Sequence, residues 1–346
     1  MHRQPVARIC ALTAVCLHLL PLGPLALLAS CSRSKSDGAG AGSSAATGSP
    51  KDSPAPAGGA VPTKLTVAAI PIVDVAPLYL GRQKGLFAAE GLELDIQNTQ
   101  GGAQSVPCVV SGQCQFGFAN VISLLLAHAK GLPLQVVTAG NFSTGKPEDF
   151  GAIIVPEGSP VKTVKDLEGK TLSVNQINNI VGVAVRAAMR KAGGDPDKIK
   201  LIEVPFPEMP AALGQKRIDA ACIVEPFLTV ARSQGATVLD WNFANLAPKL
   251  MIAAYFTTRD YAQAHADVVQ KFTAAMNKSL TYAAEHPDEA RAILLTYTKI
   301  DKAVTEKLNL PLWSPQIDRG SINLLADLIV QDKLVPSKPD VDALLR

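Results

Sequence analysis

The hydrophobic and polar positions of the chain follow a recurring pattern, which is clearest in residues 211–235. Residues 220–224 are an apolar run, too short for a helix and without polar alternation, which predicts a strand buried on both faces as in a parallel sheet. Glu225 follows this strand, and Pro226 suits the start of a helix because its fixed φ is helical and its missing N–H has no partner to lose there. Ligands of open α/β sheets bind outside the carboxyl ends of strands, so we expect Glu225 to face a cleft.

The same pattern occurs earlier, in residues 111–120. A helix end is followed by an apolar strand and the polar residue Asn120, and a helix over 121–129 then stops at a Lys-Gly pair. Two units of one topology predict two α/β lobes whose strand ends face each other.

Apolar runs and helical periodicity extend this interpretation to the rest of the chain. We expect residues 64–152 together with 251–346 to form lobe 1 and residues 153–250 to form lobe 2. The Pro- and Gly-containing segment 156–160 precedes a new helix-strand unit, and an apolar strand at 251–257 returns the chain to the first lobe. The expected strands are 64–70, 92–98, 134–139, 152–155, 199–204, 220–224, 237–240 and 251–257, and the expected helices include 121–129, 180–192, 266–285, 287–297, 302–308 and 316–331.

Two further motifs precede the two strand-helix units described above: DVAPLYLG at 74–81 and KGLF at 84–87. Together they resemble the extracytoplasmic solute-binding proteins of ABC importers for nitrate, sulfonates, taurine and thiamine pyrimidines, over residues 64–290. The resemblance implies an α/β, two-lobed periplasmic-binding-protein-like fold of type II, each lobe a mostly parallel sheet flanked by helices. It also implies closure of the lobes on a small solute, an ABC permease and its ATPase as partners, and no cofactor.

The first thirty residues predict a signal peptide. Basic residues at positions 3 and 8 precede an apolar stretch over 9–28 that Pro21 and Pro24 interrupt, so the stretch does not read as a membrane span. The ending Leu-Ala-Ser-Cys at 28–31 matches the bacterial lipoprotein cleavage box, which predicts a lipid anchor on Cys31 at the extracytoplasmic face of the cell membrane. An ordinary secretory signal with an incidental Cys is the alternative. Residues 31–63 are rich in Gly, Ala, Ser and Pro, which predicts a flexible tether.

The charge of the chain argues against a nucleic-acid partner. Removing residues 1–30 takes away two arginines and no acid, so the formal charge falls from +3 to +1. Phosphate binding needs a higher density of Lys and Arg than this. With 346 residues and 47% hydrophobic side chains, the chain has ample material for two folded lobes.

The cysteines predict one disulfide and no metal site. Thiols outside the cytoplasm tend to pair, and Cys108 with Cys114 would link a helix end to the next strand. A single Cys-x5-Cys without a second pair of Cys or His nearby does not indicate a metal centre. Cys222, inside an apolar strand, is interpreted as a small buried hydrophobic residue.

The mature chain offers little catalytic chemistry. Its histidines, at 128, 265 and 286, have no acid or thiol at triad or ligand spacing, and no nucleophile elbow, phosphate loop or zinc signature occurs. Three functions compete: a solute-binding lipoprotein, a surface-tethered enzyme related to thiamine-pyrimidine synthases, and an adhesive or signalling lipoprotein. The synthases carry a Cys-rich motif that this chain lacks, which favours solute binding without catalytic residues.

Strand ends and turns supply the candidate ligand-binding residues. Glycines that open a helix let backbone N–H groups approach a ligand, although a plain tight turn explains them equally well. One of the two asparagines before the helix at 180 should cap it, which leaves the other for a ligand. The candidates are Asp74, Gly101, Gly102, Asn120, Asn178, Asn179 and Glu225.

The type of solute is predicted from a departure from the family pattern. Sulfonate binders of the resembled family usually have Ser or Thr where this chain has Asn178 and Asn179, and no Lys or Arg lies in the matching turns. A buried anion facing Asp74 and Glu225 would be repelled by roughly several kcal/mol, whereas each helix N-terminus offsets only about 0.3–2 kcal/mol. We therefore expect a neutral or cationic solute rich in N–H donors, such as a pyrimidine or an amine. In the alternative, Asp74 only caps its helix and Glu225 points to solvent.

Overall fold

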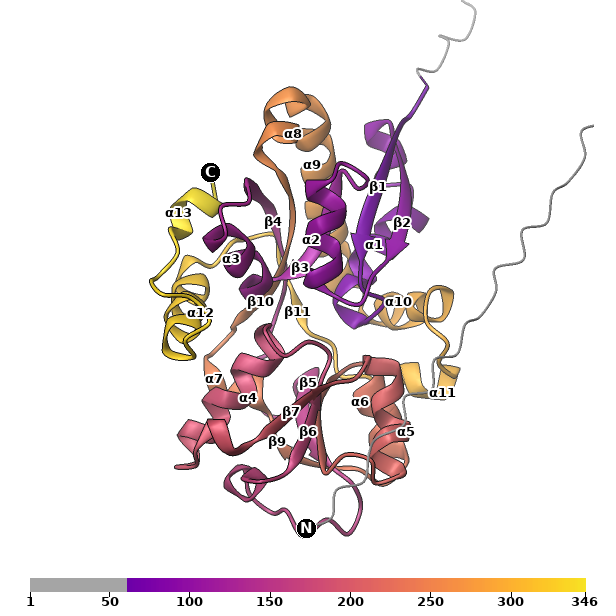
Figure 1. Cartoon of the computed structure of the whole chain (residues 1–346). Coiled ribbons are helices and arrows are strands. Elements are labelled where there is room, and N and C mark those ends of the chain that lie inside the picture. The colour runs from indigo at the N-terminus through magenta and orange to yellow at the C-terminus, as the bar shows by residue number, and fades with distance from the viewer. Residues whose placement is uncertain (1–60) are drawn as a thin grey trace, which may run out of the picture. The chain divides into compact units, whose positions relative to one another are not determined.

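The computed structural model describes residues 61–346, and two sheets organise this part of the chain (Figure 1). Sheet A has the order β11-β4-β10-β3-β1-β2, and sheet B has the order β7-β6-β8-β5-β9. Sheet A consists of β1 (Thr63–Ala69), β2 (Leu92–Asn98), β3 (Phe116–Asn120), β4 (Leu134–Phe142), β10 (Met251–Thr258) and β11 (Leu312–Trp313). Sheet B consists of β5 (Gly151–Val155), β6 (Thr171–Val174), β7 (Lys200–Glu203), β8 (Ala220–Val224) and β9 (Thr237–Asp240).

Both sheets are mixed, and most strands of each run in one direction, four of six in sheet A and four of five in sheet B, in line with the expected mostly parallel sheets. The neighbours β2-β1-β3 and β7-β6-β8 pair in parallel, as helical crossovers require. In contrast, β10 runs antiparallel to β3 and β4, and β5 runs antiparallel to β8 and β9. Strand β5 is the first strand after the chain crosses into sheet B, and β10 is the first after it returns to sheet A. Each therefore begins at the boundary between the sheets, where the parallel strands have their carboxyl ends.

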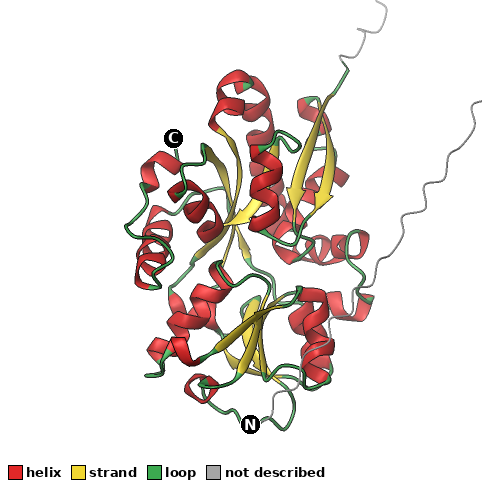
Figure 2. Cartoon of the chain, in the orientation of Figure 1, coloured by secondary structure: helices red, strands yellow, loops and turns green. Residues whose placement is uncertain are grey.

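Helices flank both sheets, as Figure 2 shows. The α-helices are α1 (Ala76–Gln83), α2 (Gly102–Val110), α3 (Val121–Ala129), α4 (Ile180–Lys191), α5 (Met209–Gly214), α6 (Phe227–Ser233), α7 (Asn242–Leu246), α8 (Arg259–Ala264), α9 (Ala266–Glu285), α10 (Pro287–Ala292), α11 (Lys302–Thr305), α12 (Arg319–Gln331) and α13 (Val341–Leu344). Short 3₁₀ helices are η1 (Val73–Val75), η2 (Ala88–Glu90), η3 (Val164–Leu167), η4 (Pro196–Lys198), η5 (Phe206–Glu208) and η6 (Ile293–Thr296).

The apolar stripe of α9 shows how the helices complete the core. Phe272, Met276 and Leu280 recur at helical spacing and are fully buried, which confirms their prediction as core residues. The Phe272 ring stacks on Phe116 of β3 with centroids 3.8 Å apart, so this helix packs directly against sheet A.

The chain passes from sheet A to sheet B between β4 and β5, and returns between β9 and β10. The division into lobes at 152/153 and 250/251 stays a prediction. The predicted signal peptide and Cys31 lie outside the described residues, as does nearly all of the tether. No helix within residues 61–346 has the length and apolar character needed to cross a membrane.

A disulfide joins Cys108 near the end of α2 to Cys114 before β3. It closes the turn between this helix and the next strand. Cys222 is a free, buried thiol in β8.

Candidate functional site

A cavity lies where the strand ends of the two sheets face each other. Its walls come from residues at the carboxyl ends of β1, β3, β6 and β8, from the N-termini of α2, α3 and α4, and from the start of β10. Ligands bind at such strand ends in open α/β sheets, so this is the candidate binding site. The lining residues on the side of sheet A are Ile70, Ile72, Asp74, Gly101, Gly102, Phe118, Ala119, Asn120, Ile252 and Ala253; those on the side of sheet B are Asn175, Asn179, Ile180, Val181, Phe206, Val224 and Phe243.

The cavity is small and largely apolar. About 40 Å³ of it can hold the centre of a water molecule. That is room for about three waters, since one water needs on the order of 10–15 Å³ in this measure. Asp74 is the one charged residue among the lining residues of the described chain.

Asp74 lies in η1, directly after the first strand of sheet A, and is only 3% exposed. Its Oδ2 accepts a hydrogen bond from Asn141 Nδ2 at 2.8 Å, and its backbone carbonyl accepts one from Trp313 Nε1 at 3.1 Å. Its Oδ1 is buried and has no partner among the described residues. Asp74 therefore brings one unsatisfied acceptor to the cavity.

Burial raises the pKa of Asp74 to about 7, against the lowering effect of the hydrogen bond from Asn141. The nearby negative charge of Asp149 raises it further. A partner that donates N–H groups or carries positive charge would stabilise the ionised form.

Glu225 is not among the lining residues, which corrects the expectation that it faces the ligand. Val224, the residue before it, lines the cavity, whereas the Glu225 carboxylate points into the protein and is fully buried. It accepts hydrogen bonds from Thr229 N at 3.0 Å, Thr229 Oγ1 at 2.8 Å and Asn309 N at 3.3 Å. The alternative, an exposed Glu225, is also wrong. Burial raises the pKa of Glu225 to about 7, and the hydrogen bonds from Thr229 are the main lowering effect.

The contacts of Glu225 join elements of both sheets, and we call them the Glu225 joint. The Glu225 carbonyl accepts a hydrogen bond from Val73 N at 3.1 Å, one residue before Asp74. Asn309, between α11 and β11, donates to the Glu225 carboxylate and through Nδ2 to the Asp149 carbonyl at 3.2 Å. The joint therefore ties the end of β8 to the segments that hold Asp74.

Asn120 and Asn179 line the cavity, but their side chains cap helices. Asn120 precedes α3, and its Oδ1 accepts from Ser123 N at 3.0 Å and from Ile180 N at 3.3 Å. Asn179 precedes α4, and its Oδ1 accepts from Val181 N at 2.9 Å and Gly182 N at 3.2 Å. Asn178 is exposed and lies outside this cavity, in a neighbouring groove.

Gly101 and Gly102 also line the cavity, and packing accounts for both. A Cβ at Gly101 would lie 2.9 Å from Gln176 Oε1, and one at Gly102 would lie 2.3 Å from the Ser123 Cβ. Gly101 has a φ of 134°, which side chains rarely adopt. The glycines thus let the N-terminus of α2 approach α3 and the loop at 175–176.

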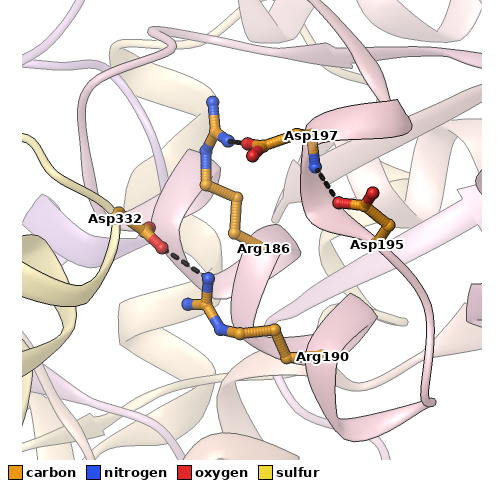
Figure 3. A network of polar contacts seen from close by, with 5 residues as sticks. All are labelled: Arg186, Arg190, Asp195, Asp197 and Asp332. Carbon is orange, nitrogen blue, oxygen red and sulfur yellow. Dashed lines mark hydrogen bonds and ion pairs between the residues drawn. The ribbon is translucent and has the colours of Figure 1, made fainter.

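At the C-terminal end of α4, an ion pair links this helix to the residue that follows α12 (Figure 3). Arg190 Nη1 lies 2.6 Å from Oδ1 of Asp332, which follows α12 and whose side chain is buried. One turn earlier, Arg186 pairs with the exposed Asp197 at 3.3 Å. Among residues 61–346, no group of three or more His, Cys, Asp or Glu side chains is placed to hold a metal ion.

The sequence interpretation missed three features of the site. Asn141, which holds Asp74, is a polar residue at the end of the apolar strand β4, a signal that could have been used. Gln176, whose Oε1 accepts from Ala103 N at 3.4 Å, lies in a polar run that gives no indication of its partner. Phe118, Phe206 and Phe243 supply apolar wall, and nothing in the sequence separates them from other core aromatics.

Comparison with known proteins identifies the family of the chain and finds binding proteins among its relatives. A family model described as NMT1/THI5 like matches residues 72–290. The riboflavin-binding protein RibY of Chloroflexus aurantiacus is 25% identical over 281 residues, which are 76% of this chain and 77% of that protein. The formylaminopyrimidine-binding protein of Halalkalibacterium halodurans is 23% identical over 255 residues, 72% of each chain.

Among solved structures, the alkanesulfonate-binding protein SsuA from Xanthomonas axonopodis pv. citri, bound to MOPS, superposes with a TM-score of 0.71. Its sequence is 21% identical, and the match covers 83% of this chain and 99% of that chain. This similarity confirms the predicted periplasmic-binding-protein-like α/β fold.

Proposed function

Because the chain belongs to the NMT1/THI5 like family, we propose that it is the solute-binding component of an ABC importer. It captures a small solute outside the cytoplasm and delivers it to a membrane permease driven by an ATPase. The lipoprotein box at 28–31 supports anchoring of the mature chain to the extracytoplasmic face of the cell membrane through Cys31. Two relatives whose alignments cover about three quarters of this chain are named as binding proteins, which supports the transport role.

The solute is a neutral or cationic molecule that presents N–H donors. The observation that carries this proposal is the Asp74 Oδ1, buried in the cavity wall without a hydrogen-bond partner among the described residues. A buried acceptor without a partner is costly, and a ligand N–H removes that cost. No Lys or Arg is among the residues that line the cavity, so nothing there neutralises a second negative charge.

The apolar walls suit a flat ring. Phe118, Phe206 and Phe243 contribute apolar faces to the cavity, which has to widen from its present volume of about 40 Å³ to admit a ring. A pyrimidine whose amino group faces Asp74 would pack its ring against the apolar walls and donate a hydrogen bond to Asp74 Oδ1. A small amine would make only the hydrogen bond.

Binding closes the two sides on the solute. The walls of the cavity come from both sheets, and its volume of about 40 Å³ has to grow by separation of the sheets before a solute fits. The solute stabilises the closed arrangement by its higher affinity for that state. Release then requires a partner that reopens the cavity, which is the role of the permease.

Calorimetry of residues 61–346 against a hydroxymethylpyrimidine, a polyamine, taurine, an alkanesulfonate and nitrate tests this proposal. We expect saturable binding of an N–H donor and a loss of about 10- to 100-fold in affinity for Asp74→Asn, which is about 1.4–2.8 kcal/mol. Asp95→Asn, an exposed acid on β2, is the matched control and should bind like the wild type.

Two results would contradict the proposal. Tight binding of an alkanesulfonate that Asp74→Asn leaves unchanged would show that the carboxylate does not select the solute. Conversion of a bound pyrimidine to another compound, followed by NMR, would favour the enzyme alternative.

A further inference from the structure

Three helices begin at the cavity, and a side-chain amide oxygen occupies the N-terminus of each. These are α2, α3 and α4, whose first N–H groups have no partner within the helix. Gln176 Oε1 accepts from Ala103 N, Asn120 Oδ1 accepts from Ser123 N and Ile180 N, and Asn179 Oδ1 accepts from Val181 N and Gly182 N. Five backbone donors that an anion could use are therefore taken by neutral amides.

Two of these contacts cross between the sheets. Asn120 ends β3 of sheet A and accepts from the first residue of α4, whereas Gln176 follows β6 of sheet B and accepts from the start of α2. Asn175 adds a third crossing, from its Nδ2 to the Gln100 carbonyl at 3.4 Å. The amides thus bridge the two sheets beside the cavity and occupy its helix N-termini in the same arrangement.

We propose that Asn120, Gln176 and Asn179 determine specificity by excluding oxyanions from the cavity. An oxyanion at these helix N-termini would have to displace the amide oxygens, and the Nδ2 groups of Asn120 and Asn179 already donate to Ser123 Oγ and Asn175 Oδ1. The unpartnered Asp74 Oδ1 on the same cavity, 3% exposed, repels the anion as well. This inference rests on the proposed solute-binding function and deepens it, because it assigns the rejection of oxyanions to named side chains.

The test is a gain of anion binding in a triple variant, Asn120→Ser, Gln176→Ala and Asn179→Ser. Serine is as good an N-cap as asparagine, so both helices keep their caps, and its hydroxyl can turn to donate to an anion. Calorimetry with methanesulfonate and with nitrate should show no saturable binding to the wild type up to about 10 mM, and at least tenfold tighter binding to the triple variant.

Asn178→Ser is the matched control, because Asn178 is exposed, outside the cavity and next to Asn179. It should bind methanesulfonate no better than the wild type. Should the triple variant fail to fold in a thermal melt, Gln176→Ala alone, in a loop, must still improve anion binding.

Micromolar binding of methanesulfonate by the wild type would overturn the proposal. So would a folded triple variant that gains no anion binding. A wild type that binds no N–H donor of the panel contradicts the proposed solute class, and the triple variant then measures the exclusion independently.

Discussion

Asp74 and Glu225 lie on either side of the boundary between the two sheets. They are almost equally buried, yet they have different roles. Both carboxylates follow a strand, both are at most 3% exposed, and burial raises the pKa of each to about 7. Asp74 keeps one oxygen without a partner at the cavity, whereas Glu225 accepts hydrogen bonds from two residues inside the protein.

The difference separates a binding carboxylate from a structural one. Burial and a raised pKa occur at both, so neither property identifies a ligand site. The distinguishing property is an unsatisfied acceptor on a residue that lines the cavity, because a buried group that the protein satisfies internally leaves nothing for a ligand. The carboxylate oxygens of Glu225 accept hydrogen bonds from Thr229 and Asn309, and these bonds stabilise the Glu225 joint.

The largest expected effect is on the pH dependence of stability. The pKa of each carboxyl is about 7 in the folded protein, compared with about 4 in the unfolded chain, so the folded protein binds more protons between these values. The free energy of unfolding is therefore highest below pH 4 on account of these groups and falls as the pH rises through 7. Each carboxyl contributes at most about 1.4 kcal/mol per pH unit.

Urea unfolding of the wild type and of Asp74→Asn/Glu225→Gln between pH 4.5 and 8 measures this effect. The double variant should gain stability relative to the wild type as the pH rises. Asp95→Asn/Glu208→Gln, which changes two exposed acids, should follow the wild type throughout. Parallel curves for the wild type and the first double variant would show that the two carboxyls do not titrate near 7.

The next effect separates the two carboxyls at pH 5, where both are largely neutral. Glu225→Ala leaves the backbone N–H groups of Thr229 and Asn309 without their acceptor and opens a void in the joint. We expect a loss of about 2–4 kcal/mol in the free energy of unfolding. Asp74→Ala should cost less, because its carboxylate accepts one hydrogen bond, from Asn141, whereas that of Glu225 accepts three.

Glu208→Ala, at an exposed position, is the control for this experiment and should change stability by less than about 0.5 kcal/mol. Equal losses for Glu225→Ala and Asp74→Ala would remove the distinction between joint and cavity. Glu225→Gln should be close to the wild type at this pH, because the protonated acid and the amide have similar shape.

Local patterns predicted the fold well because they depend on neighbours in the chain. The apolar run 220–224 is β8, the helix at 121–129 is α3, and Asn179 caps α4 as one of the two asparagines was expected to do. The direction of β5 and β10 was not predicted, because it depends on how the chain returns from the other sheet.

The role of Glu225 could not be predicted, because its partner Asn309 lies 84 residues away along the chain. Nothing near Asn309 in the sequence indicates a contact with a strand end of the other sheet. The prediction for Asn120 was incomplete for the same reason. Its capping of α3 is a local contact, whereas its contact with Ile180 joins positions 60 residues apart. The strand ends predicted which residues meet at the boundary, and only the three-dimensional contacts decide which of them remain open to a ligand.

A third buried carboxylate, Asp332, extends the comparison, because its partner is a cation. Burial raises the pKa of Asp332, and the hydrogen bond from Arg190 lowers it. Arg190→Met would leave this fully buried side chain unpaired, and we expect a loss of about 1–2 kcal/mol, since Arg190 itself is partly exposed. Arg186→Met, one turn away in Figure 3, breaks a pair whose acid is 84% exposed and should cost less than about 0.5 kcal/mol.

A double-mutant cycle with Asp332→Asn isolates the pair from the loss of packing. The coupling between Arg190 and Asp332 should exceed that between Arg186 and Asp197, for which Asp197→Asn supplies the second cycle. Equal couplings would mean that the buried pair contributes no more than a surface pair, and that the contact between α4 and α12 depends on apolar packing. A larger coupling for Arg190 would show that charge joins the two sides at this end of α4, where neutral amides join them at the other end.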